Sequence, residues 1–216
     1  AAMRSSERPE PRRYRWLAPV VAIAASLLIV CSFALLALGS DGAKPPKMVE
    51  VATAVGARKQ VDLTDGSQIT LNTDSIMRAS VATGERRVWL DRGEAFFDVA
   101  HDASRPFTVF AGDRKVTVLG TKFSIRRDGD TTIVTVAQGR VRVEDLSADD
   151  DQRATVITAG DMIATRGTSM LVAKQSRQWV EDSLSWRQGV LTFDQVTLED
   201  AAREFNRYNR RQIRIR

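Results

Sequence analysis

The sequence predicts a mainly β protein with a single transmembrane helix, then an all-β domain of two sheets, then a truncated α/β module. Three observations lead to this prediction. Residues 17–38 form a long apolar run without a charged side chain. Residues 48–174 show short apolar alternation interrupted by turn-forming dipeptides, which is typical of consecutive β-strands. Residues 175–216 then change to a pattern that contains a capped amphipathic helix.

The run 17–38 predicts a helix that spans a bilayer, because at about 1.5 Å per residue it is roughly 33 Å long. Residues 1–16 carry five arginines against two glutamates, whereas residues 39–47 form a Gly- and Pro-containing linker with less positive charge. The positive-inside rule therefore predicts a cytoplasmic basic tail, 1–16, and a C-terminal part outside the cytoplasm. In a bacterium this is a single-pass inner-membrane protein with a periplasmic domain. Ala37-Leu38-Gly39 also resembles a cleavage site, so a removed signal peptide stays an alternative.

The charge distribution argues against a nucleic-acid partner. The net charge is +5, but the arginines gather in residues 1–16 and 203–216, which leaves residues 39–202 mildly acidic. The one cysteine, Cys31, lies inside the apolar run, so the sequence predicts no intrachain disulfide. The one histidine, His101, cannot form a His cluster for a metal. With no Ser/His/Asp or Cys/His constellation in the sequence, we expect no enzyme, no metal and no cofactor.

The β-domain is expected over residues 48–174, after the linker 39–47. Many short strands at even spacing favour either a β-sandwich or a solenoid-like double sheet. Phe96 and Phe97 are adjacent, so their side chains must lie on opposite faces of one strand, and only one of them can pack between the sheets. The expected strands cover residues 49–55, 58–63, 68–71, 76–81, 87–90, 95–99, 107–111, 114–119, 121–126, 132–137, 141–146, 155–157 and 161–165.

Residues 175–216 are expected to hold a linker and the start of a βα(β) module. Val190, Leu191 and Phe193 suit a short strand. Thr197 and Asp200 form a capping box, and the apolar residues from position 198 to 208 keep the spacing of an amphipathic helix. Residues 213–215 alternate isoleucine and arginine like the beginning of another strand.

Several stretches together resemble the FecR/PupR-like transmembrane anti-sigma regulators. They include Leu63-Thr64-Asp65-Gly66-Ser67, Val116-x-Val118-Leu119 and Val134-x-Val136, and they follow the family's order over roughly residues 50–165. Residues 186–208 are similar to the start of the secretin and TonB short N-terminal module. The family-motif positions, which we expect to be structural, are Gly93, Glu94, Phe96, Phe97, Arg105, Pro106, Phe107, Gly120, Thr121, Phe123 and Gly139.

The resemblance implies cell-surface signalling that controls transcription, commonly of iron, siderophore or other nutrient uptake. It implies an extracytoplasmic-function sigma factor held through a cytoplasmic domain, and a signal from a TonB-dependent outer-membrane transducer. It also implies release by proteolysis that ends within the membrane. Sixteen residues before the span are too few for a sigma-binding domain. We therefore expect a fragment that lacks its start, with loss of sigma binding as the alternative.

Two further expectations concern partners. An exposed edge at Val190, Leu191 and Phe193 would accept a partner strand by β-augmentation, unless it pairs within its own module. The alternative function is an envelope-anchored β-domain that binds glycan or peptidoglycan and has no sigma partner.

Overall fold

The computed structural model describes residues 32, 48–81, 84–147 and 154–215. The predicted basic tail, the linker 39–47 and, apart from Ser32, the predicted span 17–38 lie outside the described residues. Within the part of the chain that is described, no helix is long and apolar enough to cross a membrane.

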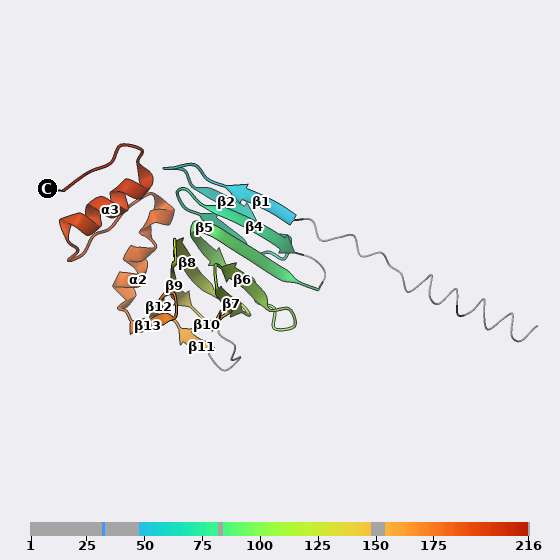
Figure 1. The fold of residues 1–216 in the computed structure, drawn as a ribbon. Helices are drawn as coiled ribbons and strands as arrows, with labels where there is room; N and C mark the ends of the chain where they lie inside the picture. The colour runs from blue at the N-terminus through green and yellow to red at the C-terminus, as the bar shows by residue number, and fades with distance from the viewer. Residues whose placement is uncertain (1–31, 33–47, 82–83, 148–153, 216) are drawn as a thin grey trace, which may run out of the picture. The chain divides into compact units, whose positions relative to one another are not determined.

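The described residues form thirteen strands followed by three short helical segments (Figure 1). The strands are β1 (Met48–Ala52), β2 (Lys59–Asp62), β3 (Gln68–Leu71), β4 (Ile76–Val81), β5 (Arg86–Asp98), β6 (Phe107–Ala111), β7 (Arg114–Val118), β8 (Lys122–Asp128), β9 (Thr131–Gln138), β10 (Arg140–Asp145), β11 (Thr155–Thr158), β12 (Asp161–Arg166) and β13 (Ser169–Lys174). The helical segments are α2 (Arg177–Ser183), the 3-10 helix η1 (Ser185–Gln188) and α3 (Leu198–Tyr208).

The strands build two layers that share β5. Sheet A has the order β1-β4-β5-β6-β7-β10-β11, and sheet B has the order β2-β3-β5-β8-β9-β12-β13. All pairs are antiparallel except β5 with β6. After β5 the chain makes hairpins that alternate between the layers, with β6-β7 and β10-β11 in sheet A and β8-β9 and β12-β13 in sheet B. The prediction of a mainly β fold is confirmed, but the two layers are joined through β5 into one curled sheet of thirteen strands.

One apolar core fills the space between the two layers. Phe97 and Phe123 of sheet B stack with ring centroids 4.9 Å apart, and Phe107 of sheet A meets Phe97 edge-on at 6.3 Å. All three rings are fully buried, and each contributes about 1.5–3 kcal/mol of burial free energy. The core includes side chains from both sheets, so neither sheet completes it alone.

The long strand β5 corrects one sequence prediction. Residues 87–90 and 95–99 were expected as two strands with a turn at Gly93, but they form one strand that passes from sheet A to sheet B. Gly93 has a φ of 87° at the point where β5 changes its partners. A Cβ atom there would lie 2.6 Å from the Cα atom of Ser75. The glycine therefore allows both the bend and the close approach of the neighbouring chain.

The C-terminal part differs more from the sequence prediction. The helix from 198 to 208 is confirmed, and Thr197 Oγ1 accepts a hydrogen bond from the backbone N–H of Asp200. The two strands expected at 190–193 and 213–215 are wrong, because neither segment has strand pairing in the structure. Strand β13 and helices α2 and η1 were not predicted. The other predicted strands are all present, with ends displaced by at most three residues.

Candidate functional site

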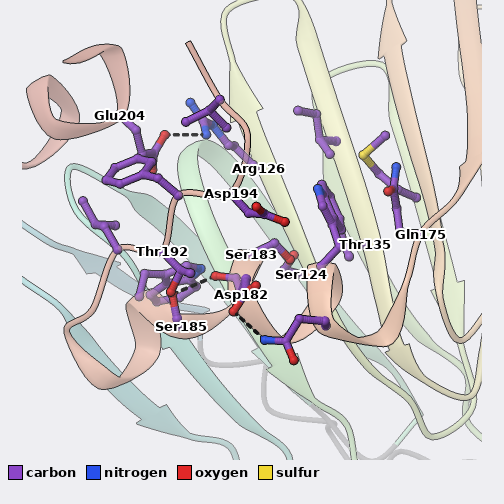
Figure 2. A pocket seen from close by; sticks show the side chains of 18 of the residues that line it. Ser124, Arg126, Thr135, Gln175, Asp182, Ser183, Ser185, Thr192, Asp194 and Glu204 are labelled. Carbon is purple, nitrogen blue, oxygen red and sulfur yellow. Dashed lines mark hydrogen bonds and ion pairs between the residues drawn. The ribbon is translucent and has the colours of Figure 1, made fainter. Parts of the chain in front are cut away.

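A cleft of about 550 Å³ lies between sheet B and the C-terminal helical segment (Figure 2). Its floor is the outer face of β8, β9 and β12. Its walls are α2, η1, the segment 191–196 and the first half of α3. We refer to this space as the C-terminal cleft.

Strand register fixes the composition of the floor. Arg126 of β8 lies opposite Ile133 of β9, which lies opposite Ala164 of β12, which in turn lies opposite Leu171 of β13. Directly opposed residues share one face of a sheet, so this row begins with a cation and continues with apolar side chains. Of this row, Arg126 and Ile133 line the cleft, whereas Ala164 and Leu171 continue it beyond the lining. Leu171 is 62% exposed and lies on the edge strand β13, so the apolar row is open at that end.

The helical segment is held to sheet B by a second apolar cluster. Phe96 points away from the main core and packs with Val180, Leu184 and Trp186. This confirms the expectation that Phe96 and Phe97 face opposite sides of their strand, with Phe97 in the main core. The guanidinium of Arg187 lies 3.9 Å from the centroid of the Phe96 ring and covers it.

A chain of ion pairs adds a second attachment. The carboxylate of Glu94 lies 2.9 Å from Arg207 Nη2 on α3, and both side chains are largely buried. Arg207 Nη1 also contacts Glu204 at 2.5 Å, and Glu204 pairs with Arg126 of the cleft floor at 2.9 Å. Burial by itself lowers the pKa of the Arg207 guanidinium. The attraction of Glu94, followed by that of Glu204, is stronger than this effect, so the pKa is raised.

Tyr208 completes this attachment at the end of α3. Its hydroxyl accepts a hydrogen bond of 2.7 Å from Asn72 Nδ2, which also donates to Glu94 at 2.9 Å. Burial is the main cause that raises the pKa of Tyr208, and the hydrogen bond from Asn72 opposes it. The end of α3 is thus tied to the loop after β3 and to the bend in β5.

The cleft itself is acidic. Its charged lining residues are one cation, Arg126, and the five acids Glu94, Asp182, Asp194, Asp200 and Glu204. Glu94, Asp200 and Glu204 each pair with an arginine. Asp182 has a hydrogen bond from Gln178 at 3.0 Å, and no cation pairs with Asp182 or Asp194 among the described residues. Figure 2 shows these two carboxylates on α2 and on the segment before α3.

An unused hydrogen-bond donor also belongs to the cleft lining. Trp186 is 4% exposed, lines the cleft, and has no acceptor for its indole Nε1–H among the described residues. A buried donor without an acceptor costs about 1–3 kcal/mol. This N–H is itself buried, so what the cleft offers to a ligand is its unpaired carboxylates and the exposed apolar surface at Trp179 and Phe193.

The family-motif glycines lie where the chain passes between the sheets. Gly139, with a φ of 90°, lies between β9 of sheet B and β10 of sheet A. Gly120 lies between β7 and β8, and a Cβ atom there would come within 2.7 Å of His101 Cα. The hydroxyl of Thr121 donates to the carbonyl of Arg140 at 3.0 Å. These positions join each hairpin to the next hairpin in the other layer, and they lie outside the cleft lining.

The motif Arg105-Pro106-Phe107 provides a backbone carbonyl that accepts a hydrogen bond from a buried arginine. Arg86 is 1% exposed, and its guanidinium donates to the carbonyls of Arg105 and Ala100 at 2.7 and 2.9 Å and pairs with Asp65 at 3.2 Å. The Arg105 side chain pairs with Asp102 at 2.8 Å. Pro106 is exposed, and Phe107 follows it into the core.

Of the residues predicted to bind a partner, Leu191 and Phe193 line the cleft and Val190 does not. Val190 is exposed, and its carbonyl accepts a hydrogen bond from Ser185. Because the segment is not a strand, it offers no ready edge for β-augmentation. The two unpaired aspartates and Trp186 were missed from sequence, since a cleft between segments distant in the chain leaves no local pattern.

The arrangement is suited to binding. Among the described residues, no group of three or more His, Cys, Asp or Glu side chains could hold a metal ion. Of the acids in the cleft lining, the buried Glu94 and the half-buried Glu204 are both paired with Arg207.

Comparison with known proteins agrees with this architecture. The FecR protein family model matches residues 49–142, which cover β1 to β9 and the start of β10. Over these residues the β-domain is similar to FecR proteins. Two crystal structures of a proposed anti-sigma factor from Parabacteroides distasonis resemble this chain with TM-scores of 0.64 and 26% identity. One similarity covers 75% of each chain and the other 74% of each. No curated protein sequence gives a significant match.

Proposed function

We propose that this chain regulates a sigma factor. The observation that carries the proposal is the FecR-like domain, matched over residues 49–142, in a chain similar over three quarters of its length to a proposed anti-sigma factor. The two chains are 26% identical, so they are similar in sequence as well as in the arrangement of their strands. Regulation by binding also suits a site that combines a cleft, unpaired carboxylates and exposed apolar side chains.

The membrane and signalling parts of the proposal come from the sequence. The apolar run 17–38 and the arginine-rich residues before it support a single-pass inner-membrane protein whose FecR-like domain is periplasmic. The family resemblance supports an extracytoplasmic-function sigma factor as the cytoplasmic partner and a TonB-dependent transducer as the outer partner. Cleavage by an intramembrane protease would then release the sigma factor.

Signal reception is proposed to occur at the C-terminal segment. This segment is attached to sheet B by the Phe96 cluster and by the Glu94–Arg207 pair. A partner that binds in the C-terminal cleft contacts sheet B and the helices together, so binding changes how firmly the segment is held. A change in this attachment is a physical means to alter access of a protease to the chain nearer the membrane.

The experiment is a chromosomal deletion of the gene in its native host, followed by RNA sequencing and complementation. We expect a small set of promoters to change expression, and the change should vanish when one sigma-factor gene is also deleted. A two-hybrid assay between the full-length protein and that sigma factor should give a signal. Unchanged transcription of every sigma-dependent promoter, under inducing and non-inducing conditions, would overturn the proposal.

The glycan-binding alternative gains little from the structure. Its best candidate platform is Trp89, on the outer face of sheet A. That ring already stacks on Phe110 at 5.6 Å, and the Arg78 guanidinium lies 5.8 Å from its centroid.

A further inference from the structure

We infer that the C-terminal cleft binds an extended peptide segment of a partner protein, in which basic side chains alternate with apolar ones. The inference rests on the proposed function, because it gives the chemistry of the segment that would deliver the signal. Two properties of the cleft lead to it: the charge of its walls and the apolar side chains of its lining.

Charge complementarity identifies the basic side chains. Asp182 and Asp194 line the cleft from two different segments, and neither has a cation beside it among the described residues. Every other acid in the lining already pairs with an arginine of this chain. A partner lysine or arginine would therefore find two carboxylates available, whereas an acidic segment would be repelled.

The floor identifies the apolar side chains. Ile133 of β9 is an apolar residue of the floor. Ala164 and Leu171 continue its row outside the cleft lining, as far as the edge strand β13. Met162 lies on the same side, and Phe193 and Val196 remain exposed at the rim, with 37% and 48% of their surface accessible. Side chains that alternate along an extended segment can meet this row on one side and the acidic walls on the other.

The test uses the full chain in nonionic detergent and a fluorescein-labelled peptide of alternating lysine and isoleucine. We expect saturable binding by fluorescence anisotropy, and none with a peptide of alternating glutamate and isoleucine. The double variant Asp182→Asn/Asp194→Asn should weaken binding about fivefold to tenfold at low salt, since exposed ion pairs contribute modestly.

A matched control separates the cleft from general charge attraction. Glu181 and Glu199 neighbour the cleft on α2 and α3 but do not line it. The double variant Glu181→Gln/Glu199→Gln changes the net charge equally and should bind as the wild type does. Equal loss in both double variants, or unchanged binding by Asp182→Asn/Asp194→Asn, would overturn the inference.

A second measurement does not depend on the variants folding. A photo-crosslinking group at the centre of the peptide should label residues 124–135 and 175–196 of the wild-type chain. Labelling confined to sheet A, or displacement of the peptide by self-association of the chain, would overturn the assignment. Neither measurement involves a sigma factor, so failure here is distinct from unchanged transcription in the deletion strain.

Discussion

The buried pair between Glu94 and Arg207 gives the sharpest test of how the C-terminal helices are held. Glu94→Gln removes one charge while keeping the size of the side chain and an oxygen that accepts from Asn72. Arg207 then keeps a single carboxylate partner, Glu204, at 2.5 Å. The perturbation therefore weakens the attachment of α3 to β5 without opening a cavity.

The expected loss follows from burial. The side chains of Glu94 and Arg207 are 8% and 16% exposed, so solvent screens their attraction little. Removing one partner of a buried pair costs about 3–5 kcal/mol, and we reduce this to about 2–3 kcal/mol because Glu204 remains. For a unit of this size the melting temperature should fall by roughly 4–12 °C.

The assay is thermal and urea unfolding of the unit 46–216, followed by circular dichroism and by tryptophan fluorescence. Trp179 and Trp186 belong to the helical segment, so fluorescence reports its attachment as well as global unfolding. The matched control is Glu181→Gln, which breaks an exposed pair with Arg177 and should cost at most about 0.5 kcal/mol. If Glu94→Gln costs no more than this control, the pair does not hold the segment.

Two further predictions concern the bend and the end of α3. Gly93→Ala should lower the free energy of unfolding by roughly 2–4 kcal/mol, because it adds a steric clash with Ser75 to the strain of a positive φ. Gly129 is also at positive φ but in open space, so Gly129→Ala should lower it by only about 1–2 kcal/mol. Equal losses for the two variants in urea unfolding would show that the contact with Ser75 is unimportant. In the unit 46–216 the sole tyrosine is Tyr208, so its absorbance at 295 nm should titrate with a midpoint above the ordinary value of about 10 and return toward 10 in urea. Because the folded pKa is raised, the stability that depends on neutral Tyr208 is complete below about pH 10 and is lost as the pH rises through the folded pKa. A folded midpoint at or below 10 would contradict the burial of this hydroxyl.

Local patterns in the sequence were enough to predict most of the β-domain. Alternation of apolar residues located nearly all strands, because one face of each strand packs in the core. The same alternation assigned Phe96 and Phe97 to opposite faces. It failed at Gly93, where a glycine that would end a strand elsewhere bends a continuous one. Whether a glycine turns or bends a strand depends on the strands beside it, which the local sequence does not contain.

The C-terminal segment was predicted less well for a related reason. Thr197 and Asp200 marked the start of α3 correctly, since a capping box depends on residues close in sequence. Residues 190–193 looked like a strand because they are apolar, but Leu191 packs on the Phe96 cluster and Phe193 contacts Phe205 of α3 at 5.4 Å. The cleft arises where these distant segments meet, so only tertiary structure reveals it.

The most direct test of the account is sigma-dependent transcription in the native host, measured with a promoter reporter under inducing conditions. The full-length gene would carry Asp182→Asn/Asp194→Asn or the control Glu181→Gln/Glu199→Gln, at matched protein levels. If the chain regulates a sigma factor and receives its signal in the C-terminal cleft, the first allele loses induction and the control keeps it. Wild-type induction from both alleles would contradict the account.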